Sequence, residues 1–416
     1  MILLARKLLP ITGPPVDNGA LVIKGKVIED MGARKDVLKR HPGERVVDLG
    51  GRLVMPGLVN PHTHLDLSNL KGLVEGKDFF DWIFSLVEQR RRLGSRGLAG
   101  SIKGSLRELL STGTTCIGDI SSTDKALPVI VKSGIRAVSF LEVIGPGNAG
   151  ADEVFARLTG RLKGLGGKPG RITAGIAPHS PYSVSPKLIK QIAKFILSNN
   201  IRVAIHISET KDESLYLSGR PSGLDRYFRH FGWRGHKHTG EGSSLQYLKG
   251  LGIGSGLLAV HAVNLASGDI GLLKKSGASV VHCPRSNHLL RVGRARVGEM
   301  IKRGVNVALG TDSLASNIDL DLWEEMRFAY LVNDLPAKTI IEMATINGAR
   351  ALGLGKVTGS LEPGKEADVI AVHTPAAMLD DPYRALLLGT RKGDVSATLV
   401  QGMPLHSTDG YISDGF

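Results

Sequence analysis

Eight short apolar segments recur between residues 58 and 312, and stretches with helical periodicity separate them. The segments are 58–64, 114–120, 136–143, 171–179, 202–208, 257–264, 279–285 and 306–312. Several are almost wholly apolar, which is typical of parallel strands that are covered on both faces. Between them, apolar residues recur at helical spacing, as in 186–197 and 322–332. Eight strand–helix units in this alternation predict an α/β fold, a (β/α)₈ TIM-like barrel.

Both ends of the chain carry a different pattern, in which glycine turns join short strands. We expect strands at 21–23, 27–29, 45–49 and 53–55, and again at 367–372 and 394–400. Chain ends often meet in folded domains. We therefore predict that residues 1–57 and 357–416 form one small β-sandwich, and that residues 58–356 form the barrel domain.

The charge of the chain restricts its partners. It has 53 Lys and Arg against 39 Asp and Glu, a net charge of +14, but the basic residues are scattered. The densest run, Arg90-Arg91-Arg92, follows a helical pattern, and we interpret it as a solvated helix face. We expect no nucleic-acid partner, and instead a basic surface that attracts a small anionic substrate.

Three further features bear on location. No apolar run approaches the roughly 18 residues of a membrane-spanning helix, so we predict no membrane partner. Residues 1–10 lack the order of a signal peptide. The two cysteines, Cys116 and Cys283, lie in predicted strands, so we expect no disulfide and a cytoplasmic location.

Polar residues interrupt six of the predicted strands at their C-terminal ends. They are His62 and His64, His179, His206 and Glu209, His261, His282, and Asp312. The C-terminal strand ends form the rim where such barrels carry their active sites. A single buried histidine is usually a satisfied core residue, but six such ends together predict one functional site.

Four of these residues have the chemistry of metal ligands. His62 and His64 are two apart, so on a strand their side chains face the same way. His206 and Asp312 would approach from the fifth and eighth strands. Three imidazole nitrogens and one carboxylate oxygen suit a catalytic zinc that keeps a position for water. We predict one divalent metal per chain, zinc or iron.

Several runs resemble the amidohydrolase superfamily along nearly the whole chain. VMPGLVNPHTH at 54–64 resembles the signature that leads into its first barrel strand, and GSLEPGKEAD at 359–368 resembles its return into the β domain. HISET at 206–210, SN at 286–287 and GTDSLASN at 310–317 resemble one branch, of adenosine-type deaminases and chlorohydrolases. Two-metal relatives often carry a lysine at the end of strand four, where this chain has His179. The resemblance therefore implies the one-metal type.

The resemblance also implies roles for two carboxylates. Asp312 would be a metal ligand and would take the proton of the attacking water, and Glu209 would protonate the ring nitrogen beside the attacked carbon. Because Glu209 stands at an odd offset from His206, the strand must end near Ser208 for it to face the site. The alternative is that Glu209 is only a carboxylate at a helix N-terminus.

Other residues would contact the substrate. By the same resemblance His261 would hydrogen-bond the attacking or newly formed oxygen, and His179 would bind the substrate. Glu88 is a candidate for the glutamate with which relatives hold the ribose hydroxyls, and Arg285 is a candidate for an anionic group. The sequence does not decide whether His282 is a core residue or a functional one.

The substrate is expected to be a nucleoside-like small molecule. The end of the third strand, 140–143, lacks an arginine that relatives acting on S-adenosylhomocysteine carry. The segment 211–256 is either a solvated insertion or a loop over the site. It is rich in basic residues: Arg226, Arg229, His230, Arg234, His236 and His238. These features favour aminodeoxyfutalosine, a benzoate-bearing intermediate of menaquinone biosynthesis, over S-adenosylhomocysteine or methylthioadenosine.

Rival functions remain. The same site can deaminate or dechlorinate another heterocycle, such as a triazine or guanine. A non-enzymatic scaffold relative is the distant alternative, because such proteins lose metal ligands that this chain retains. The sequence leaves the oligomeric state open, a homo-oligomer included.

Overall fold

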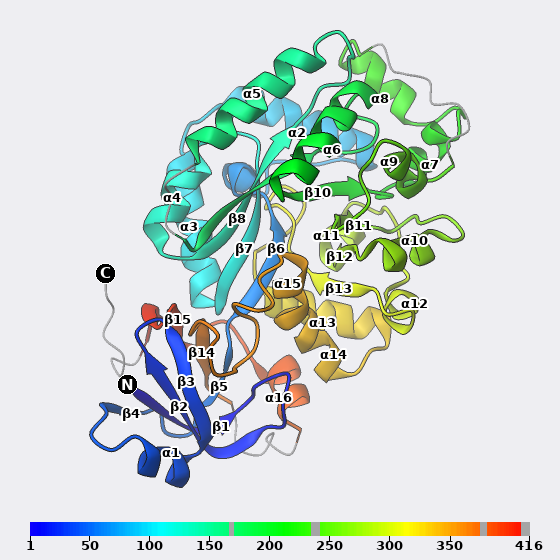
Figure 1. The fold of residues 1–416 in the computed structure, drawn as a ribbon. Helices are drawn as coiled ribbons and strands as arrows, with labels where there is room; N and C mark the ends of the chain where they lie inside the picture. The colour runs from blue at the N-terminus through cyan, green and yellow to red at the C-terminus, as the bar shows by residue number, and fades with distance from the viewer. Residues whose placement is uncertain (166–169, 234–241, 375–380, 409–416) are drawn as a thin grey trace.

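The computed structural model describes residues 1–165, 170–233, 242–374 and 381–408. Eight parallel strands form one sheet in chain order (Figure 1). They are β6 (Leu58–Thr63), β7 (Thr114–Ser121), β8 (Arg136–Val143), β9 (Ile172–Pro178), β10 (Arg202–Ile207), β11 (Leu258–His261), β12 (Ser279–His282) and β13 (Asn306–Leu309). A parallel bridge between Thr63 and Asp312 joins the two edges. The predicted barrel is confirmed, and each of the eight predicted segments overlaps one strand.

The strands alternate between two hydrophobic clusters. Val260 and Val281 belong to a cluster built mainly of strand residues, whereas their neighbours Ala259 and Val280 belong to a cluster shared with the helices. This period of two follows from the opposite directions of successive side chains in a strand. Both faces are apolar because one meets the barrel interior and the other meets the helices.

Helices and a short 3₁₀ segment connect the strands. They are η1 (Leu65–Leu70), α2 (Phe79–Leu93), α3 (Leu98–Ser111), α4 (Ala126–Ser133), α5 (Ala151–Gly164), α6 (Pro186–Asn199), α7 (Lys211–Leu217), α8 (Leu224–His230), α9 (Ser244–Gly250), α10 (Asp269–Ser276), α11 (Pro284–Leu289), α12 (Val297–Lys302), α13 (Leu322–Asn333), α14 (Ala337–Met343) and α15 (Ile346–Ala351). Helix α6 shows why they form: Ser185 caps its N-terminus, Pro186 occupies its first turn, and Leu188, Ile192 and Ile196 recur on its buried face. Among the described helices, none combines the length and apolar character that a membrane crossing requires.

The second sheet combines strands from both chain ends. It contains β1 (Ile2–Leu8), β2 (Val16–Lys24), β3 (Val27–Ala33), β4 (Val46–Asp48), β5 (Leu53–Pro56), β14 (Val369–Val372), β15 (Val395–Val400) and β16 (Met403–Ser407), with α1 (Arg34–Arg40) and α16 (Pro382–Gly389) between them. β5 pairs with β1 on one side and with β14 on the other, which joins the two ends of the chain. Ile28 of β3 and Leu399 of β15 share one core, so the sheet folds over on itself.

Strand β1 is not among the expected strands. Ile2 and Leu4 face one cluster, beside α1, and Leu3 and Ala5 face another. Both faces of the strand are therefore covered, and the apolar run at the N-terminus is a central strand. Gly57 alone separates β5 from β6. The boundaries of the two domains, at residues 57 and 357, stay a prediction.

A buried ion pair links the two sheets. Arg136 of β8 donates to both carboxylate oxygens of Asp368, at 2.7 and 3.0 Å, and also to Glu366. Arg136 is 3% exposed and Asp368 is 1% exposed. The carboxylate of Asp368 therefore depends on Arg136 to compensate its charge, because it does not reach water.

We expect Arg136→Ala to lower the free energy of unfolding by about 3–5 kcal/mol, since it leaves a buried carboxylate without its partner. Chemical denaturation would measure the loss. Arg157→Ala, which removes an exposed pair with Glu153, is the control and should change stability by less than about 1 kcal/mol. Equal effects of the two changes would contradict the prediction.

Candidate active site

The closure of the barrel brings Asp312 beside the two histidines of β6. Asp312 follows β13 with a positive φ of 59°, and its amide donates to the carbonyl of His62 at 3.1 Å. Gly310 permits this approach, because a Cβ there would lie 3.0 Å from the Cβ of His62. Asp312 Oδ1 then lies 3.4 Å from His62 Nε2 and 3.5 Å from His64 Nε2.

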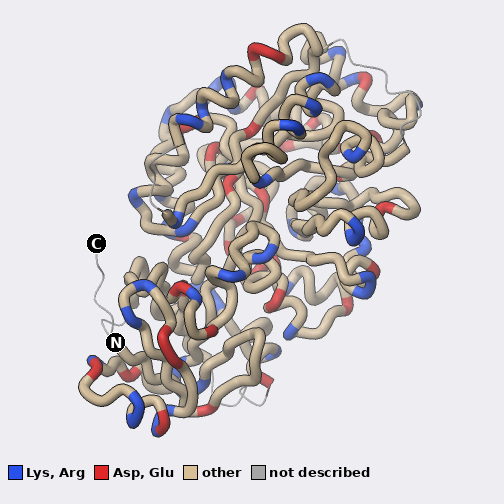
Figure 2. The backbone as a smooth tube through the Cα atoms, viewed as in Figure 1, with Lys and Arg blue, Asp and Glu red and all other residues tan. Residues whose placement is uncertain are grey.

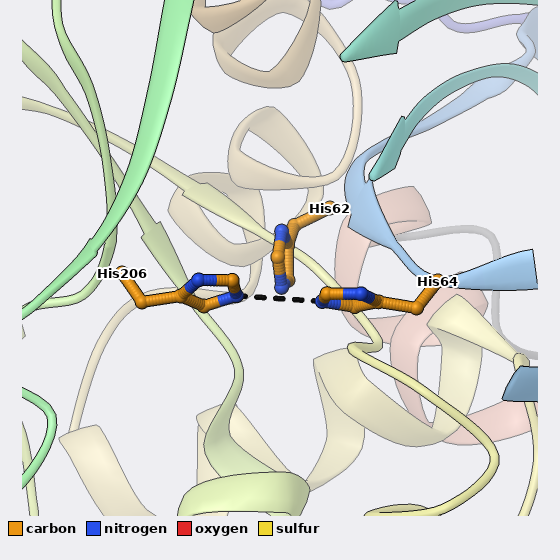
Figure 3. A group of neighbouring side chains, drawn as sticks. All are labelled: His62, His64 and His206. Carbon is orange, nitrogen blue, oxygen red and sulfur yellow. Dashed lines mark hydrogen bonds between the residues drawn. The ribbon is translucent and has the colours of Figure 1, made fainter. Parts of the chain in front are cut away.

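His62, His64 and His206 form a group that fits a metal ion. One ring nitrogen from each lies within 4.8 Å of the others, and the three rings point toward one another (Figure 3). His206 Nε2 is 3.3 Å from His64 Nε2. Two nitrogens bound to one tetrahedral zinc at about 2.0–2.1 Å are about 3.3–3.4 Å apart, so the spacing suits such an ion. Both ring nitrogens of His62 are buried without a hydrogen-bond partner, and metal coordination would satisfy one of them.

Burial sets the charge of these ligands. It lowers the pKa of His62 to about 4 and the pKa of His64 well below its usual range, so both rings are neutral near pH 7. Burial would raise the pKa of Asp312, but contact with His62 and electrostatic interactions with His62 and His64 hold it well below its usual range. Neutral imidazoles and an ionised carboxylate are the forms that bind metals.

Neighbouring groups orient the ligands. His206 Nδ1 donates to the carbonyl of His179 at 2.8 Å, which leaves Nε2 free toward the other histidines. Asp312 Oδ2 accepts from the hydroxyls of Ser286 and Ser316 at 2.6 and 2.7 Å, which leaves Oδ1 beside His62 and His64. Each ligand thus presents one atom to the group.

Glu209 and His261 lie in the same pocket. β10 ends at Ile207 and Ser208 has a positive φ of 49°, so the expected end of the strand near Ser208 is confirmed. Glu209 Oε1 is 3.4 Å from His261 Nε2, and His261 Nδ1 is 2.8 Å from Asn287 Oδ1. Burial raises the pKa of Glu209 to about 8, so its carboxyl holds a proton near neutral pH.

The pocket has a volume of about 140 Å³ and one largely apolar wall. Its lining includes His64, His179, His206, Glu209, His261 and Asp312, with Phe79, Trp82, Ile83, Leu86 and Val87 from α2. His179 Nδ1 is 2.8 Å from Ser183 Oγ, and burial lowers the pKa of His179 to about 3. A neutral imidazole with its other nitrogen free suits a contact with a polar ring.

Two residues expected at the substrate lie elsewhere. Glu88 is exposed on α2 and does not line the pocket, because its side chain leaves the helix on the solvent face. Arg285 is also outside it: its guanidinium makes two hydrogen bonds to Asp319, at 2.7 and 3.2 Å, and lies 3.8 Å from Glu325. We correct both assignments. His282, left open by the sequence, is buried and likewise lies outside the pocket lining.

The segment 211–256 contributes an aromatic residue to the pocket. Tyr227 of α8 lines it, whereas Arg226 pairs with Asp81 at 2.7 Å and Arg229 donates to a backbone carbonyl. Arg226, Arg229 and the exposed His230 are absent from the lining, and Arg234, His236 and His238 lie outside the described residues. The described basic residues of this segment therefore do not reach the substrate pocket.

Sequence reasoning missed Arg90 and Glu142, which do line the pocket. The interpretation of the arginine run as a solvated helix face is wrong for Arg90. Its spacing held the signal: residues 82, 83, 86, 87 and 90 fall on one helix face, and all five line the pocket. Lys and Arg are otherwise spread along the chain among Asp and Glu (Figure 2).

Comparisons with known proteins agree with this geometry. A family model for the amidohydrolase family matches residues 53–405. The chain is 30% identical over 409 residues to a 5-methylthioadenosine/S-adenosylhomocysteine deaminase of Moorella thermoacetica, covering 95% of this chain and 91% of the relative. It is 32% identical over 381 residues to a 5′-deoxyadenosine deaminase of Methanothermobacter thermautotrophicus, covering 88% and 84%. An adenosine deaminase from Xanthomonas campestris with bound zinc superimposes with a TM-score of 0.86 at 28% identity, covering 98% and 92%.

We expect about one tightly bound divalent metal per chain, because one set of neutral imidazoles converges here with an ionised carboxylate. Elemental analysis of the purified protein would measure it. His206→Ala should lose most of the metal, whereas His373→Ala, an exposed histidine of the other domain, should keep it. Two metals per chain at full occupancy, or unchanged metal content in His206→Ala, would contradict the prediction.

Proposed function

The chain belongs to the amidohydrolase family, and from that premise we propose that it is a metal-dependent deaminase of an adenine nucleoside altered at its 5′ side. The observation that carries the proposal is the pocket itself. It combines the metal-type ligands with a protonated carboxyl, Glu209, and a flat apolar wall from α2. The activities named for the relatives support the choice of an adenine nucleoside.

His62, His64, His206 and Asp312 would hold one divalent metal, zinc or iron. When bound, the metal would supply Lewis acidity that makes a water molecule nucleophilic near neutral pH. Asp312 would also accept the proton of that water, because its low pKa keeps the carboxylate ionised and Oδ1 lies on the side of the histidines.

Glu209 would act as the general acid. Attack on the carbon that carries the amine pushes electron density onto the adjacent ring nitrogen, and a carboxyl proton there neutralises it. A pKa of about 8 keeps that proton on Glu209 until the ring needs it. The proton that Asp312 takes from the water would then pass to the amine, which leaves as ammonia, while the ring nitrogen keeps the proton of Glu209.

The two remaining histidines would position the reactants. His261, held through Nδ1 by Asn287, would hydrogen-bond the attacking oxygen with Nε2. His179, whose Nδ1 faces Ser183, would bind the heterocycle. Phe79, Trp82 and Ile83 offer a surface against which a flat base packs.

We expect Glu209→Gln to keep its metal and lose about 10² to 10⁴-fold in kcat, since it removes proton transfer and leaves coordination intact. Glu153→Gln, an exposed change on α5, is the control and should behave as the wild type. Loss of metal in Glu209→Gln would show instead that Glu209 is a ligand.

Ammonia release from a panel of substrates tests the reaction itself. We expect the highest kcat/KM for an adenine nucleoside altered at its 5′ side. The panel contains methylthioadenosine, S-adenosylhomocysteine, aminodeoxyfutalosine, adenosine, guanine and a chlorinated triazine. The sequence favoured aminodeoxyfutalosine within this class, and it stays in the panel as an alternative, because neither Arg285 nor the described basic residues of 211–256 line the pocket. A best rate with guanine or the triazine, or no ammonia from any nucleoside, would refute the proposal.

A further inference from the structure

Arg90 and Glu142 line the active-site pocket from elements that carry no metal-type ligand. Arg90 lies on α2, and Glu142 lies near the end of β8. A nucleoside whose amine lies at the histidine–aspartate group must place its other polar groups against the rest of the lining. These two residues carry the opposite charges of that remaining wall.

Arg90 is held in place by a chain of polar groups. Its Nη2 donates to Ser122 Oγ at 2.6 Å, and Ser122 Oγ donates to Asp66 Oδ2 at 3.4 Å. Asp66 Oδ2 also accepts from the amide of Thr123 at 2.6 Å. The guanidinium is therefore fixed, and a carboxylate already stands behind it.

The carboxylate of Glu142 is available to a substrate. Among the described residues none donates a hydrogen bond to its carboxylate, and no ion pair joins it to Arg90 directly. Its backbone carbonyl accepts from Arg161, which anchors the main chain and leaves the side chain to the pocket. In the lining of this wall, the guanidinium of Arg90 is accompanied by the carboxyl of Glu142, so an ionised Glu142 leaves the wall without excess positive charge.

We propose that Glu142 and Arg90 form a subsite that accepts a hydrogen-bond donor of the nucleoside, a hydroxyl or an ammonium, and disfavours a carboxylate. The proposal rests on the proposed deaminase function and names the chemistry of its substrate. A donor would satisfy the free carboxylate of Glu142. Burial raises the pKa of Glu142 to about 7, so its carboxyl is ionised at pH 8. At that pH an anion would meet like charge from Glu142, while Asp66 stands behind Arg90. This is the reverse of the anionic preference that the basic composition suggests.

A matched pair of compounds isolates the charge. Adenosine-5′-carboxamide and adenosine-5′-carboxylate have nearly the same size and differ in charge and donors. We expect the wild type to prefer the carboxamide by about tenfold or more in kcat/KM. If turnover is slow, the ratio of their inhibition constants against methylthioadenosine deamination replaces it.

Two variants test whether Glu142 and Arg90 cause the preference for the carboxamide. Glu142→Gln should lower the ratio of kcat/KM for the carboxamide to kcat/KM for the carboxylate about tenfold, because it removes the charge that repels the carboxylate. Arg90→Gln should raise the same ratio, because it removes the positive charge. Arg91→Gln and Glu153→Gln, both exposed, should leave it unchanged. Each ratio is taken within one variant, so partial misfolding does not alter it.

The outcomes separate the two proposals. A wild type that deaminates nucleosides but prefers the carboxylate, or a Glu142→Gln variant with an unchanged ratio, overturns this subsite and leaves the deaminase function standing. Absence of ammonia from every adenine nucleoside overturns both.

Discussion

The closure of the barrel between β6 and the segment after β13 is the contact on which the site depends. It consists of a few main-chain and side-chain hydrogen bonds: Asp312 N to His62 O, and Thr63 Oγ1 to the carbonyl of Asp312 at 3.2 Å. These bonds place the first and last strands of the barrel in register. Without them the histidines of β6 and the carboxylate of Asp312 would stand at opposite edges of an open sheet.

Two buried carboxyl groups of the pocket have opposite protonation states because their neighbours differ. Asp312 lies against His62 and His64, and its pKa stays well below the usual range. Glu209 is buried to a similar degree, but its pKa rises to about 8 because desolvation outweighs the favourable charge of His206. A base and an acid at one pH therefore follow from neighbours alone, since the chemical groups are the same.

The strands and the rim residues were predictable from the sequence because their signals are local. Burial on both faces produces apolar runs, and a polar residue at the end of such a run stands at the rim of any parallel barrel. Glu209 is an example of such a local signal. Its offset from His206 predicted that the strand ends near Ser208, and β10 ends at Ile207. Arg285 shows its limit, because Asp319 and Glu325, which bind its guanidinium, lie 34 and 40 residues away in the chain.

By itself, the sequence determined the barrel, the order of its strands and the residues at its rim, all through periodicity and residue type. The tertiary structure alone decided which charged residues face the pocket. Arg90 enters it because α2 packs with that face inward, and Glu88, two residues earlier, points to solvent. Glu142 and Arg90, some fifty residues apart in the chain, line the same pocket. The spacing along α2 shows which residues share a helix face, but which pocket that face meets depends on how distant elements pack, and no local pattern encodes that packing.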